Sequence, residues 1–196
     1  MDADQVNALR ILLGSSGWLE RTWSFARALR GSAPRTPGGL LIVGTPDEEP
    51  WHLAAHLDQE SQLAGVPGLA PTLVRWDPPP QGPPHLRVGI ARLEEARRGE
   101  TLFVVSPQAA PAPLLERVHD ARRTGATILA LDQGDPDLDD MAHEYLCVTP
   151  EAAPFSFDAA QHLVSAAAGE PGPARTGPRA RLARLLDAIS GAPPDS

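Results

Sequence analysis

The chain has 196 residues, with 17 basic and 25 acidic side chains and a formal net charge of −8. This length fits one α/β domain with short appendages, and the negative charge argues against a nucleic-acid-binding surface, which requires a cationic footprint. Every basic residue is arginine, so the absence of lysine excludes a lysine Schiff base and a P-loop.

Residues 1–31 are predicted to form N-terminal helices. Their apolar positions follow helical spacing, which is interrupted by the glycines and serines of residues 14–17. Trp18 and Trp23 are candidates for a homodimer surface, since aromatic anchors often mark such patches. Packing of both tryptophans in the core of the subunit is the equally favoured alternative. A linker rich in proline and glycine follows at residues 32–38.

The next segment alternates strands and helices. Residues 39–43 form an apolar strand, residues 50–64 a helix with proline at its first turn, and residues 72–76 a second strand. Residues 78–84 are proline-rich, which indicates a polyproline-like spacer; recruitment of a proline-reading partner is the alternative. Residues 88–98 are predicted to form a helix.

The remaining elements begin with a βαβ unit. The predicted elements are strand 101–106, helix 114–123, strand 125–131, short helix 137–143, strand 145–148 and helix 157–168. Together they predict an α/β fold with a three-layer, doubly wound parallel sheet of the flavodoxin-like type. Residues 170–196 are predicted to be a proline-rich linker and a basic amphipathic tail helix, which docks on a subunit or binds an anionic partner.

Three segments resemble sugar isomerase (SIS) domains. These are the strand ending at Gly44, the helix beginning with His52, and the glycine-bounded βαβ unit that includes residues 121–131. The branch that they resemble most is the phosphoheptose isomerases and their noncatalytic relatives. The resemblance implies an SIS-type α/β domain over residues 39–169, which holds a sugar phosphate between the loops after its first and third strands.

Both of these loops depart from the pattern of the family. The first keeps Gly44, followed by Thr45, and adds three acidic residues at positions 47–49 that would repel a phosphate. The second keeps Ser106, followed by Gln108, but its alanines and prolines remove hydroxyl and N–H donors. The resemblance thus places a ligand at Gly44, Thr45, Ser106 and Gln108, without the usual donors for a phosphate.

The catalytic motif is altered as well. His52 and His56 fall on the family's H-F-A-A-E, in which the histidine binds zinc and the glutamate abstracts a proton. Histidine is also a possible base. His162 falls in the family's later metal motif, where the other ligand positions are Ala159 and Ala167. We therefore expect no metal site and no cofactor. Independent of the family, the spacing of His52 and His56 is compatible with metal binding, and a polar helix edge is the favoured alternative.

The five aspartates of an acidic loop complete the candidate sites. They are predicted to form a solvated turn with acids at a helix start, with a divalent cation site as the alternative; they are Asp132, Asp135, Asp137, Asp139 and Asp140.

These observations favour a noncatalytic SIS-like protein that binds a carbohydrate derivative or a protein partner and forms a homodimer. The alternative is an aldose–ketose isomerase that acts through His52 and His56. A third possibility is a regulatory scaffold whose arginine-bearing tail binds nucleic acid or an acidic protein. No apolar run approaches the ~20 residues of a membrane span, and the first residues lack the apolar core of a signal peptide. We expect a cytoplasmic protein.

Overall fold

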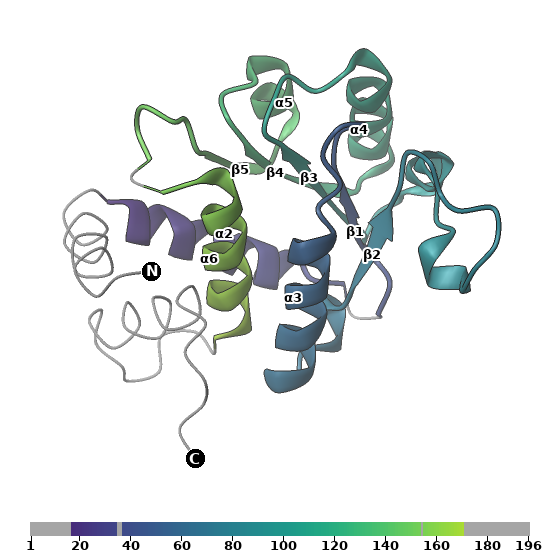
Figure 1. Cartoon of the computed structure of the whole chain (residues 1–196), viewed down its shortest axis with the longest axis horizontal. Helices are drawn as coiled ribbons and strands as arrows, with labels where there is room; N and C mark the ends of the chain where they lie inside the picture. The colour runs from purple at the N-terminus through teal and green to yellow at the C-terminus, as the bar shows by residue number, and fades with distance from the viewer. Residues whose placement is uncertain (1–16, 35–36, 154, 171–196) are drawn as a thin grey trace.

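A five-stranded parallel sheet forms the centre of the molecule (Figure 1). The computed structural model describes residues 17–34, 37–153 and 155–170. The strand order is β2-β1-β3-β4-β5, which confirms the predicted flavodoxin-like arrangement. The strands are β1 (Leu40–Val43), β2 (Pro71–Val74), β3 (Thr101–Ser106), β4 (Thr127–Asp132) and β5 (Glu144–Cys147).

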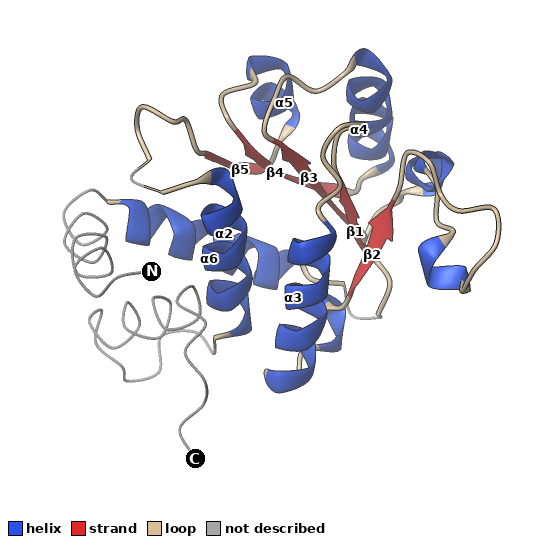
Figure 2. Cartoon of the chain, in the orientation of Figure 1, coloured by secondary structure: helices blue, strands red, loops and turns tan. Residues whose placement is uncertain are grey.

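Helices cover both faces of the sheet, as Figure 2 shows, so the structure has the three predicted layers. One face carries α2 (Trp18–Ser32), α3 (Trp51–Leu63) and α6 (Phe157–Gly169), and the other carries α4 (Ala112–Thr124) and α5 (Pro136–Met141). The helix expected before residue 14 and the tail helix expected after residue 170 lie outside the described residues. None of the described helices is both long enough and apolar enough to cross a membrane.

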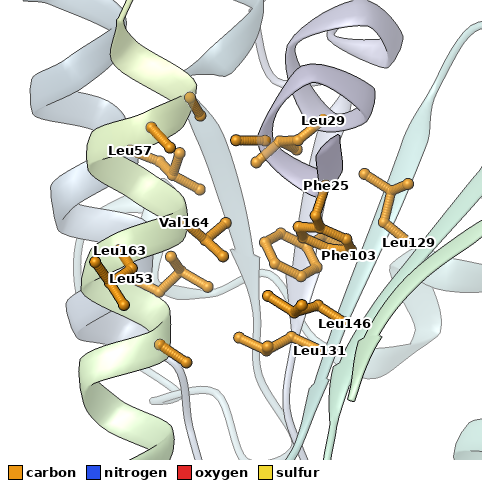
Figure 3. Packing of buried hydrophobic residues seen from close by; sticks show 14 of the residues in the cluster. Phe25, Leu29, Leu53, Leu57, Phe103, Leu129, Leu131, Leu146, Leu163 and Val164 are labelled. Atoms are coloured by element: carbon orange, nitrogen blue, oxygen red, sulfur yellow. The ribbon is translucent and has the colours of Figure 1, made fainter. Parts of the chain in front are cut away.

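The alternation of side chains along the strands builds two cores. Successive residues of a strand point to opposite faces, so Ile42 and Phe103 contact one helical layer while Leu41 and Val104 contact the other. Figure 3 shows the larger core, where side chains of α2, α3 and α6 meet those of the sheet. Burial of each such leucine or phenylalanine contributes roughly 1.5–3 kcal/mol. Long apolar runs in the central strands are the sequence pattern of a sheet covered on both faces.

Trp18 belongs to this core. Its side chain is 1% exposed, its indole N–H donates to the carbonyl of Ala152 at 2.9 Å, and its ring meets Phe155 edge-on. Trp23 is partly buried and packs against the same cluster. In this chain both tryptophans therefore help to attach α2 to the sheet.

The predicted helix over residues 88–98 is wrong. The structure has only the short 3-10 helix η3 (Ile90–Glu95) there. The reason lies in the preceding residues, because Gly89 forms a parallel bridge with Arg75, and the Arg75 N–H donates to the Val88 carbonyl at 2.9 Å. This pairing holds the backbone extended where the helix would begin.

Candidate ligand-binding site

The sheet has its topological switch point between β1 and β3, where the order of the strands reverses. Ligands of open α/β sheets bind at the carboxyl ends of the strands at such a point. Val43 pairs with Val104 in the β1–β3 ladder, so Thr45 and Ser106 lie at equivalent positions, each two residues farther along its strand. The predicted residues Gly44 and Gln108 belong to the same two loops. These loops are the candidate binding site.

The β1–α3 loop is held by the end of β2. The indole N–H of Trp76 donates to the Gly44 carbonyl at 2.9 Å, and Arg75 forms two hydrogen bonds with the carboxylate of Glu49, one of them 2.8 Å long. Gly44 is also sterically required, because an added Cβ would lie 1.9 Å from the Glu48 carbonyl oxygen. The sequence predicted that Glu49 would repel a phosphate, but its charge is paired with Arg75 within the chain.

The β3–α4 loop directs its donors inward. Ser106 is fully buried, and its hydroxyl donates to the Gln108 carbonyl at 2.6 Å. The Ala110 N–H donates to Oδ2 of Asp135 at 2.6 Å. A protein carboxylate therefore occupies one of the N–H groups that could hold an anion at the start of α4. Gln108 itself has an exposed side chain beside this turn.

The acidic loop that contributes Asp135 differs from the predicted solvated turn. Asp132 is completely buried and Asp135 is 8% exposed. Asp135 is the N-cap of α5, where its Oδ1 accepts hydrogen bonds from the backbone N–H groups of Asp137 and Leu138. The predicted role as acids at a helix start holds for Asp135, but its position is interior. The fully buried Leu138 of α5 holds Asp135 in the interior, whereas Asp137 and Asp140 are exposed, as predicted for a solvated turn.

A histidine cluster lies on the neighbouring helices α3 and α6, which pack together (Figure 1). The rings of His56 and His162 have centroids 4.5 Å apart and meet edge to face. His52 stacks on Trp51, and Nε2 of His162 lies 3.6 Å from Oδ2 of Asp158. The sequence did not predict the contact between His56 and His162, although the alignment of His162 with the family's metal motif was a signal for it.

The cluster sets the charge state of His56. Burial lowers its pKa from the ordinary value of 6.5, and the neighbouring His162 and His52 lower it further, while Asp158 acts in the opposite direction. His56 is consequently a neutral imidazole at pH 7, with one nitrogen that accepts and one that donates. Within the described ranges there is no group of three or more histidine, cysteine, aspartate or glutamate side chains placed to hold a metal ion.

Comparison with solved structures identifies the fold. A protein from Silicibacter pomeroyi DSS-3, assigned as a phosphosugar isomerase, matches 95% of this chain with a TM-score of 0.55 and 17% sequence identity. The chain spans about half of that protein, 53% of its length. The sugar isomerase domain of an RpiR transcription factor from Sphaerobacter thermophilus matches 88% of this chain and 90% of its own length, with a TM-score of 0.51 and 15% identity. The chain therefore shares the α/β fold of these two structures.

Sequence-based comparisons add nothing to this result, since no family model and no curated protein matches the chain.

Proposed function

We propose that this chain is a noncatalytic SIS-fold domain that binds a carbohydrate derivative through its hydroxyl groups rather than through a phosphate. The ligand lies at the switch point between the β1–α3 and β3–α4 loops. The observation that carries the proposal is the bond from Ala110 N–H to Asp135, which places a carboxylate inside the loop that would hold a dianion. A phosphate there would meet this negative charge at close range.

The loops retain groups suited to sugar hydroxyls. The side chain of Gln108 is exposed at the edge of the sheet and offers both donor and acceptor atoms. Thr45 lies across the switch point from it, two residues beyond the end of β1, and is largely buried. Backbone carbonyls and amide side chains bind neutral hydroxyls without a cation. This chemistry fits a sugar or amino sugar better than its phosphate ester.

The direct test is binding of matched pairs, glucose with glucose 6-phosphate and glucosamine with glucosamine 6-phosphate, followed by NMR of the labelled protein. We expect shifts in the amides of Thr45 and Gln108 with at least one unphosphorylated sugar, and no tighter binding of its phosphate. Replacement Gln108→Ala should weaken sugar binding by about tenfold, the effect of one lost hydrogen bond to a ligand. Gln59→Ala, on the exposed side of α3, is the matched control.

Binding of a sugar phosphate at least tenfold tighter than the parent sugar, lost in the Gln108→Ala variant, would contradict the proposal.

The histidine cluster supports a second candidate, an aldose–ketose isomerase. A neutral imidazole such as His56 is a possible general base, and His162 touches it from α6. Coupled assays over a panel of aldoses and ketoses distinguish the two functions. The noncatalytic proposal expects no turnover; turnover abolished by His56→Ala but retained by His119→Ala, an exposed histidine of α4, would establish the enzyme instead.

The homodimer also remains a prediction. Its sequence argument is reduced by the burial of Trp18 in the core. Light scattering on the purified chain at micromolar concentration measures the oligomeric state directly. A strict monomer would contradict the predicted homodimer.

A further inference from the structure

Two carboxyl groups face each other behind the β3–α4 loop. Asp132, the last residue of β4, is completely buried, and its Oδ1 accepts the Gly134 N–H at 2.6 Å. Its Oδ2 is buried, as is Oδ1 of Asp139 on α5, and no donor from the described part of the chain reaches either atom. A buried oxygen without a donor is costly. One proton shared between the two carboxyl groups would give both atoms a hydrogen-bond partner.

The arrangement indicates where that proton lies. The carboxyl group of Asp132 lies within hydrogen-bonding reach of Asp139, and an ionised carboxylate can only accept. One of the two must be protonated for the bond to form. In agreement with this, burial raises the pKa of Asp139 to about 7, and the hydrogen bond and the charge of Asp132 contribute in the same direction.

The other charged groups around Asp132 and Asp139 either raise the pKa of Asp139 further or do not lower it. On α5 and its cap, Asp140 and Asp135 raise the pKa of Asp139 further. From β5, the Cys147 thiol lies close to both carboxyl groups, and its own pKa is raised by burial and by their charge. From α4, Arg122 donates to the backbone carbonyl of Asp140. Arg21 of α2 acts on Cys147 from the exterior.

Asp135 connects this pair to the candidate binding site. The same carboxylate caps α5 through Oδ1 and binds the Ala110 N–H of the β3–α4 loop through Oδ2. The cap keeps its position only while α5 is seated. Asp139 lies on the next turn of α5, so its bond to Asp132 and the bond of Asp135 to the loop depend on the same short helix.

We propose that a proton shared by Asp132 and Asp139 seats α5 against the sheet, and that loss of this proton releases the β3–α4 loop from Asp135. Without the proton, two carboxylates face each other in a buried space, which favours the departure of α5. The loop then recovers the Ala110 N–H for a ligand. This control belongs to the loop itself and holds whatever ligand the site takes.

The pH range follows from the two states of Asp139. Its pKa is about 7 with α5 seated and returns toward the ordinary 3.8 once α5 leaves. Between these values, opening releases a proton, so the opening equilibrium rises by up to tenfold per pH unit. Above pH 7, Asp139 is ionised in both the seated and the open state, so the opening equilibrium no longer changes with pH. The seated state is thus favoured at low pH, and its advantage is lost as the pH rises toward 7.

Amide hydrogen exchange at Ala110 tests the proposal on the intact chain. Its protection factor, corrected for the intrinsic pH dependence of exchange, should fall by about tenfold per unit from about pH 5 to pH 7 and then level off. The Asp139→Asn variant keeps a donor toward Asp132 but has no side chain at position 139 that titrates. The protection factor of the Ala110 amide in this variant should therefore stay constant with pH. Asp137→Asn, on the exposed side of the same helix, should keep the wild-type slope.

A constant protection factor in the wild type, or a slope that survives in the Asp139→Asn variant, overturns the proposal. Should that variant fail to fold, Asp132→Asn provides the same test. The side-chain carboxyl ¹³C shift of Asp139 in the wild type is an independent measurement: a midpoint near 7 supports the proposal, and one below about 5 refutes it.

Discussion

The two loops at the switch point are closed by different chemistry. The β1–α3 loop is held from β2, by the Arg75–Glu49 ion pair and the Trp76–Gly44 hydrogen bond. The β3–α4 loop is held from α5, by the Asp135 carboxylate on Ala110. Arginine keeps its charge over the ordinary pH range, and in our proposal only the contact of the β3–α4 loop depends on a shared proton. On that proposal, the β1–α3 loop forms the rigid side of the candidate site and the β3–α4 loop forms the adjustable side.

The largest test of the rigid side is Gly44→Ala. The new Cβ would lie within 1.9 Å of the Glu48 carbonyl oxygen, so the loop must move, and we expect a loss of about 3 kcal/mol in the free energy of unfolding. Gly31→Ala is the control, because its Cβ meets nothing within 4 Å in helix α2. Urea denaturation of both variants measures the difference; equal stabilities would show that the loop is not constrained as described.

An intermediate effect is expected on the adjustable side from Asp135→Ala. This change removes the N-cap of α5 and the acceptor of the Ala110 N–H, at a cost of about 2 kcal/mol. Amide shifts should change in the β3–α4 loop and stay constant in the β1–α3 loop. Asp137→Ala retains the cap and should cost much less. Equal shifts in both loops would remove the distinction between them.

The smallest effect is expected from Glu49→Gln. The Arg75–Glu49 pair is partly exposed, with side chains 26% and 33% accessible, so its loss should cost only about 0.5–1 kcal/mol. This cost should be the same at pH 6 and pH 8 and should shrink at high salt. Asp47→Asn, on the exposed turn of the same loop, serves as control. A strong pH dependence of the stability difference between this variant and the wild type would show that the Arg75–Glu49 pair also titrates.

The fold was largely predictable from the sequence because the apolar runs of the buried strands are distinct. Residues 101–106 were predicted as a strand and form β3 over the same residues. The helix predicted at residues 88–98 failed for a tertiary reason, since its apolar spacing is real but Gly89 is paired with Arg75 of the neighbouring chain segment. The spacing of apolar residues along residues 88–98 cannot predict the pairing of Gly89 with Arg75.

For the candidate site, the sequence predicts only which two loops lie at the switch point. The loops after β1 and β3 follow from the strand order, but the direction of each polar group does not. Asp135 appears in the sequence as one of several acids in a turn, and only the seating of Leu138 brings it inside. Similarly, His56 and His162 are far apart in sequence, and their contact depends on the packing of α3 against α6.

The contacts of Arg75 with Glu49 and of Trp76 with Gly44 have a consequence for redesign. A serine-rich phosphate loop grafted after β1 would lose Glu49 and the conformation of Gly44, and would leave the Arg75 guanidinium and the Trp76 indole without the groups they bind. Introducing a phosphate-binding loop therefore requires compensating changes at the residues that follow edge strand β2. Directed evolution confined to the two loops would leave Arg75 and Trp76 without partners. Libraries should therefore vary positions 75 and 76 from the first round.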